Sequence, residues 1–233
     1  MTDRAFQYIG RGVYSLPEAE RLTGVPRRSI RRWTTGYEWS SRGHLHRSPP
    51  VIGAELHLLL GTPALDFADL IEVRFLNAFL DKGVSWKTIR VASERAKEVL
   101  GTAHPFSHRR FSTDGHTILA ELARVEEDSV LLDLVRDQYE LDRMVSQYLF
   151  GQLDFGADNT PRRWFPLGVE RHIVIDPERA LGAPIVRDSG IPTAVLANAA
   201  IAEGSTERVA DMFEVDEGAV ADAVEYEASR AAA

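Results

Sequence analysis

Residues 15–34 read SLPEAERLTGVPRRSIRRWT and predict two short helices joined by a tight turn. Ser15 is a residue type that commonly caps the start of a helix. Apolar residues then recur at helical spacing along one face: Leu16, Ala19 and Leu22. Gly24 suits the left-handed conformation that ends a helix, and Pro26 suits the first turn of the next one.

The second of these helices, predicted over residues 26–34, carries arginines at positions i, i+1, i+4 and i+5: Arg27, Arg28, Arg31 and Arg32. At about 100° per residue they form two adjacent rows, while Ile30 and Trp33 point the other way, into the core. Because guanidinium groups crowded on one short helix repel each other, we expect an anion such as DNA phosphate to bind there. A solvated basic face is the alternative interpretation.

When two helices joined by a turn bind DNA, the second lies in the major groove with its N-terminal residues at the base edges. This geometry assigns groove contacts to Arg27 and Arg28, and phosphate contacts to Arg31 and Arg32. Residues 40–43, with the sequence SSRG, predict the tip of a hairpin that would touch the flanking backbone. The predicted DNA-binding residues are therefore Arg27, Arg28, Arg31, Arg32, Arg42 and Arg47.

The net charge of the 233-residue chain, −8, is divided unevenly along it. Residues 1–50 carry +5, residues 51–166 carry −5 and residues 167–233 carry −8. A basic head and an acidic tail indicate two partners of opposite charge.

Several functional classes are excluded by composition. The chain has no Cys, which rules out disulfides, a thiolate nucleophile and Cys-ligated zinc. No apolar run approaches the roughly 20 residues that span a bilayer, and the N-terminus lacks a signal core, so we expect a cytoplasmic protein without membrane contact. The histidines lack metal-ligand spacing, and no catalytic motif occurs. We therefore expect no enzyme activity, no cofactor and no metal.

The middle of the chain predicts further helices over residues 66–80 and 86–100. Asp114-Gly115 lies between runs that bear apolar residues and predicts a hairpin over residues 109–124. An apolar stripe over residues 129–149 predicts a long amphipathic helix, which lies either in the core or at a dimer seam.

Residues 151–168 are rich in Gly, Asp, Asn and Pro and predict a linker. We therefore expect a DNA-binding region over residues 1–150 and an acidic interaction domain over residues 169–233. The last domain ends in a second predicted pair of helices whose expected outer positions are acidic: Asp216, Glu217, Asp222, Glu225 and Glu227. DNA phosphate would repel them, so we predict binding to a protein or self-association. A generic acidic dimerisation domain is the alternative.

The N-terminal motifs resemble the opening of MerR-type winged helix-turn-helix regulators. The resemblance rests on YSLPEA at 14–19, LTGV at 22–25 and RSIR at 28–31, and it continues through GVSW at 83–86. It covers roughly residues 12–100. The resemblance implies that residues 26–34 form the recognition helix and that Arg28 contacts DNA.

Residues 172–227 resemble a small antitoxin domain of unknown function that is commonly encoded beside PIN-like toxin nucleases. The shared motifs, in order, are IVIDP at 173–177, GAPIV at 182–186, GIP at 190–192, and GS at 204–205. With its N-terminal head, the whole chain is similar to a VapB-type antitoxin. The partner-binding residues inferred from this likeness and from the acidic helix are Asp216, Glu217, Asp222, Glu225, Ile191 and Pro192.

We therefore predict a mainly α fold with small β-hairpins, comprising a MerR-like winged helix-turn-helix and a C-terminal helix-turn-helix-like antitoxin domain. The predicted function is that of a type II antitoxin. It would repress its own operator by binding double-stranded DNA and neutralise a PIN-like ribonuclease by direct contact. Because one recognition helix reads only a few base pairs, we expect a homodimer. The alternative is a stand-alone MerR-like transcriptional regulator that dimerises through its C-terminal domain.

Overall fold

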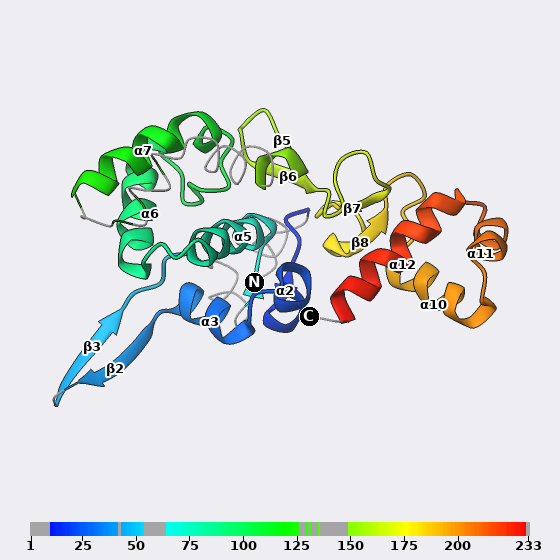
Figure 1. Ribbon diagram of the computed structural model, residues 1–233, viewed down its shortest axis with the longest axis horizontal. Coiled ribbons are helices and arrows are strands. Elements are labelled where there is room, and N and C mark those ends of the chain that lie inside the picture. Colours follow the sequence, from blue (N-terminus) through cyan, green and yellow to red (C-terminus); the bar gives the residue numbers. More distant parts are fainter. Residues whose placement is uncertain are drawn as a thin grey trace, which may run out of the picture. The chain divides into compact units, whose positions relative to one another are not determined.

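The computed structural model describes residues 10–41, 43–53, 64–125, 129, 131, 135 and 149–231. The chain divides into two compact units (Figure 1). One comprises Tyr14–Phe150 with Phe155–Pro161, and the other comprises Met1–Val13, Gly151–Asp154 and Arg162–Ala233. Both are built mainly from helices with small antiparallel sheets, so the mainly α class is confirmed.

Helices α2 (Leu16–Thr23) and α3 (Arg27–Thr35) form the predicted pair. The Ser15 backbone N–H donates to the Glu18 carboxylate at 2.7 Å, and the Ser15 hydroxyl accepts the Glu18 N–H, a reciprocal cap that fixes the start of α2. Gly24 ends the helix with a φ of 74°. Before α2, β1 (Tyr14–Ser15) pairs with β4 (Ala64–Leu65).

The predicted hairpin follows α3 as strands β2 (Tyr37–Ser41) and β3 (His44–Ser48), and Figure 1 shows it extending away from the helices of its unit. Gly36 begins it with a φ of 73°, and a Cβ there would lie 2.5 Å from the Ser48 carbonyl oxygen. Only glycine fits this close approach of two backbones.

The helices α5 (Phe67–Asp81) and α6 (Trp86–Leu100) lie where the periodicity predicts them. Asp66 caps α5 and Ser85 caps α6. The core of this unit is aromatic and aliphatic, and its largest fully buried members include Phe75, Phe79, Phe106, Phe111, Leu70 and Leu76.

The hairpin predicted over residues 109–124 is wrong, because Phe111–Val125 form helix α7. Its apolar residues recur at helical spacing and are buried: Phe111, Ile118, Leu119 and Leu122. Gly115 is not a turn residue here. It packs against the Phe111 ring, and a Cβ at this position would lie 2.9 Å from that ring.

The long helix predicted over residues 129–149 lies mostly outside the described residues. Of the part that is described, Leu131 and Val135 are buried. The choice between core and dimer seam stays a prediction.

The predicted linker, residues 151–168, contains regular structure. It includes η2 (Phe150–Gln152), β5 (Leu153–Phe155) and β6 (Pro161–Trp164). Strands β7 (Ile173–Ile175) and β8 (Pro184–Val186) complete a sheet of order β5-β6-β7-β8. The turn η3 (Ala180–Gly182) joins the last two strands.

Three helices follow in the C-terminal unit: α10 (Thr193–Glu203), α11 (Thr206–Phe213) and α12 (Glu217–Ala231). Figure 1 shows α12 running alongside α10. Their shared core contains residues from strand β7 as well as from the helices, including Ile173, Leu196, Val209, Val220 and Tyr226. Among the described residues, no helix is both long and apolar enough to cross a membrane.

Candidate nucleic-acid interface

The α3 arginines predicted to bind DNA are all exposed, while Ile30 and Trp33 are buried beneath them. They are not equivalent. The Arg27 Nε atom lies 3.8 Å from the Glu20 carboxylate, which also accepts the Arg27 backbone N–H at 2.9 Å. Among the described residues, Arg28, Arg31 and Arg32 have no carboxylate within ion-pair distance.

Arg32 takes a different position from its neighbours. Its guanidinium carbon lies 4.1 Å from the centroid of the Tyr37 ring, the geometry of a cation–π contact. Since Tyr37 begins β2, Arg32 connects the end of α3 to the hairpin. The sequence pattern predicts a phosphate contact for Arg32 and does not indicate this ring contact.

The hairpin carries the remaining basic residues. Arg42 lies outside the described residues. The Arg47 Nε atom lies 3.9 Å from the Glu38 carboxylate across the strands, and both side chains are largely exposed. Trp39 and His46, which the sequence pattern does not single out as a pair, stack with ring centroids 5.1 Å apart.

Helix α6 holds α3 and the hairpin in place. The Trp33 ring stacks on Trp86 at 5.7 Å, and the Trp33 carbonyl accepts the Val51 N–H at 2.8 Å. The Arg90 guanidinium donates to the hydroxyl of Ser48, the last residue of β3. The basic helix is therefore supported from behind by packed aromatic rings and by the returning chain.

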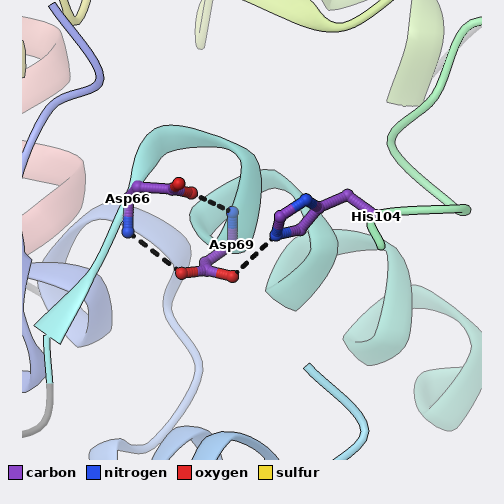
Figure 2. A group of neighbouring side chains, drawn as sticks. All are labelled: Asp66, Asp69 and His104. Carbon is purple, nitrogen blue, oxygen red and sulfur yellow. Dashed lines mark hydrogen bonds and ion pairs between the residues drawn. The ribbon is translucent and has the colours of Figure 1, made fainter. Parts of the chain in front are cut away.

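A second cluster of ionisable groups lies buried at the start of α5 (Figure 2). The Asp66 carboxylate accepts the Asp69 N–H at 2.9 Å, and the Asp69 carboxylate accepts the Asp66 N–H at 3.1 Å. The other Asp69 oxygen lies 2.9 Å from the His104 Nε2 atom. One turn further along, the Glu72 carboxylate accepts the Ser107 N–H at 2.7 Å.

Burial and the contacts within this cluster together shift its pKa values. Burial raises the pKa of Asp69 to about 6, against the opposing effect of the His104 hydrogen bond, and it raises the pKa of Glu72 to about 7. Burial alone would lower the pKa of His104. The hydrogen bond to Asp69 and the charges of Asp69 and Glu72 outweigh it and raise that pKa to about 9.

The Asp66, Asp69 and His104 ligand atoms lie within 4.8 Å of one another, close enough to share an ion. Both carboxylates, however, already accept backbone N–H groups at the start of α5, those of Asp66 and Asp69. The cluster caps α5, and its contacts with His104 and Ser107 hold residues 104–107 against that helix. The sequence pattern does not reveal it because Asp69 and His104 are 35 residues apart.

In the C-terminal unit, the prediction that Asp222 lies on the outer face of α12 is wrong. Asp222 is 5% exposed. Its carboxylate accepts the Arg171 Nε–H at 2.8 Å and the His172 N–H at 3.0 Å, and it lies 2.9 Å from the His172 Nδ1 atom. Partial burial alone would raise the pKa of Asp222. The hydrogen bonds from Arg171 and His172 outweigh burial and lower that pKa to about 2. Arg171 also contacts Glu225 at 2.5 Å, so part of the acidic character of α12 is neutralised within the unit.

The other predicted partner residues are placed at the surface or close to it. The Asp216 side chain is 72% exposed and accepts the Gly218 N–H at 2.8 Å. Glu217 is exposed and accepts the Thr206 hydroxyl at 2.7 Å. Pro192 is exposed immediately before α10, and Ile191 is half-buried against the core. Their role in binding stays a prediction.

Comparison with known proteins covers both units. Residues 173–226 match a family described as "Protein of unknown function (DUF433)". The chain is 28% identical over 223 residues, 91% of its length and 92% of the relative's, to "Putative antitoxin VapB45" of Mycobacterium tuberculosis. It is also 29% identical over 104 residues, 44% of the chain and 40% of the relative, to the uncharacterized protein Rv2308 of the same organism.

The X-ray crystal structure of Rv2018 from Mycobacterium tuberculosis has a similar fold, with a TM-score of 0.71 and 26% identity. The match covers 91% of this chain and 96% of that one. Over most of its length, the chain is thus similar to a protein described as an antitoxin, and the resemblance to VapB-type antitoxins that its motifs indicate is confirmed.

Proposed function

We propose that this chain is the antitoxin of a type II toxin–antitoxin pair, which binds its operator DNA as an autorepressor and neutralises a PIN-like ribonuclease by direct contact. The observation that carries the proposal is the similarity, over 91% of the chain, to a protein described as an antitoxin. The proposed antitoxin acts in the cytoplasm as a homodimer, without enzymatic activity of its own.

The order α2, α3 and hairpin β2–β3 supports the DNA-binding part of the proposal, because a helix pair followed by a hairpin is the order expected of a winged helix-turn-helix. In that arrangement α3 enters the major groove and the hairpin lies over the flanking backbone. Arg28 and Arg31 suit this task because an arginine with no carboxylate partner can pair bidentately with guanine or with phosphate. Arg27 and Arg47 would exchange a carboxylate neighbour for phosphate.

The toxin-binding part rests on the surface of the C-terminal unit. Its exposed acids, among them Glu207, Asp211 and Glu217, complement the basic surface that a ribonuclease presents to RNA. Large apolar side chains are exposed on the same unit. Ile201 on α10 is 78% exposed and Met212 on α11 is 59% exposed, so both are available for an apolar contact with a protein partner.

Co-expression of the full-length chain with the product of the adjacent gene tests the proposal. The chain should restore growth to cells in which that product is toxic, and the two proteins should co-purify. Toxicity that persists despite equal amounts of the chain, with no co-purification, would contradict the antitoxin function. Binding to operator DNA in that case would favour the stand-alone regulator.

A further inference from the structure

One face of the β2–β3 hairpin is aromatic. Residues two apart on a strand share a face, so Tyr37 and Trp39 lie together, and His46 is the cross-strand partner of Trp39. The Tyr37 and Trp39 rings are 5.3 Å apart, and the Trp39 and His46 rings are 5.1 Å apart and inclined by 17°. We call Tyr37, Trp39 and His46 the aromatic face.

The aromatic face continues the basic row of α3. Arg32 lies over the Tyr37 ring at 4.1 Å, and Arg28 stands one helical turn before Arg32 in the same row. Cationic and aromatic side chains therefore follow one another from the N-terminal end of α3 onto the hairpin. Because Arg32 of α3 contacts the Tyr37 ring, the aromatic face lies on the side of the hairpin that adjoins α3.

Core packing does not account for the aromatic face. Among the described hairpin residues only Ser48 is buried, and Trp39 is 44% exposed. Leu45, on the opposite face, pairs with Ser40 and is 72% exposed. The rings are thus stacked at the surface, and the Tyr37 ring contacts Arg32, which has no carboxylate partner among the described residues.

We propose that the aromatic face packs against the sugars and base edges of duplex DNA beside the groove that α3 enters, with Trp39 as its main contact. The inference rests on the proposed DNA binding and adds a contact that is not ionic. The exposed part of Trp39 offers apolar surface to the deoxyribose rings and base edges, while the arginines of α3 neutralise phosphates. Duplex DNA is favoured over a single strand because the face continues a helix, and the major groove admits a helix.

The test compares Trp39→Ala, Trp39→Phe and Leu45→Ala in the full-length chain, titrated onto a duplex from the region upstream of its own gene at several salt concentrations. Removal of the ring should weaken binding about tenfold at every salt concentration, because the contact buries apolar surface of the indole. The slope of log K against log salt should not change, because no charge is removed. Trp39→Phe should retain most of the affinity, and Leu45→Ala should bind like the original chain.

The outcomes separate this inference from the proposed function. If Trp39→Ala binds normally while Arg28→Ala does not, the aromatic face makes no contact and DNA binding by α3 stands. If the original chain binds no duplex, this inference fails together with the DNA-binding part of the proposed function. Equal weakening by Leu45→Ala would contradict a contact specific to this face, and tighter binding to the single strands than to the duplex would overturn the duplex as ligand. Unchanged thermal unfolding of each variant shows that the fold is intact.

Discussion

Individual arginines of α3 differ in what surrounds them, although they look alike in the sequence. Glu20 lies beside Arg27, Tyr37 lies beneath Arg32, and Arg28 and Arg31 have no carboxylate partner among the described residues. Helical spacing predicts that all share a face, because that depends only on local geometry. It does not predict their partners, since Glu20 belongs to another helix and Tyr37 to a strand.

Replacing Arg28 or Arg31 with Ala should weaken binding to operator DNA. Removing one phosphate-bound arginine reduces the magnitude of the slope of log K against log salt by about 0.9. The matched control is Arg208→Ala, which removes an exposed arginine from α11 in the acidic unit and should leave the slope unchanged. Fluorescence anisotropy titrations measure the affinity and the slope. An unchanged slope in Arg31→Ala together with an unchanged affinity in Arg28→Ala, whose expected contact lies in the groove, would contradict the placement of α3 on DNA.

Glu72 should make stability depend on pH. Its pKa rises from 4.5 to about 7 on folding, so its contribution is fully present below about pH 4.5 and is lost as the pH rises through 7. His104, with a pKa of about 9, acts in the same direction at higher pH. The free energy of unfolding should therefore fall from pH 5 to pH 8, with Glu72 contributing up to about 3 kcal/mol.

Urea unfolding of Glu72→Gln at a series of pH values checks this prediction. The amide keeps an oxygen for the Ser107 N–H but does not titrate, so the variant should lose less stability than the original chain over that pH range. The exposed Glu94→Gln on α6 serves as control and should follow the original chain. Identical pH profiles for Glu72→Gln and the original chain would be inconsistent with a titrating Glu72.

Among the elements, those predicted correctly carry local signals of their own. Helices α2, α5 and α6 have caps and apolar periodicity within their own residues, and residues 40–43 mark the hairpin tip. The sequence does not predict helix α7 because Asp114-Gly115 is a turn signal in isolation, whereas burial of Phe111 and Leu119 favours the helix. The outward orientation predicted for Asp222 is wrong for a related reason, since its partner Arg171 lies 51 residues away.

At the junction of α3 and the hairpin, Gly36→Ala should cost more stability than Gly43→Ala. Both glycines have a φ between 70° and 80°, but a Cβ at Gly36 would lie 2.5 Å from a backbone oxygen, while nothing lies within 4 Å of one at Gly43. We expect a loss of about 3 kcal/mol at Gly36 and about 1–2 kcal/mol at Gly43. Thermal or urea unfolding measures the difference, and equal losses would show that the backbone contact is unimportant.

In the whole molecule, charge is separated between the two ends of the chain. The first fifty residues carry +5 and the last sixty-seven carry −8. The net charge of the whole chain, −8, therefore hides the basic character of its first fifty residues. We therefore propose that the two partners engage different units, in which case their binding should be separable by single substitutions.

Ile201→Glu should abolish co-purification with the toxin and growth rescue, because it places a charge in an apolar contact, yet it should leave operator binding intact. Ala221→Glu adds the same charge at an exposed site on α12 and is the control. Arg28→Ala, expressed from an unrelated promoter, should lose operator binding and keep both co-purification with the toxin and growth rescue. Loss of growth rescue in Arg28→Ala, or of DNA binding in Ile201→Glu, would contradict independent sites.

The buried Asp222 carboxylate and its partners Arg171 and His172, which we call the Asp222 clamp, have a mechanical consequence. Arg171 and His172, just before β7, hold a carboxylate of the last described helix, so the clamp closes a loop of about fifty residues around the core of the C-terminal unit. A force applied beyond α12 reaches this clamp before it reaches the strands. An energy-dependent protease that pulls the chain from that side would therefore have to extract the buried Tyr226 side chain and break the Asp222–Arg171 ion pair before it reached the strands.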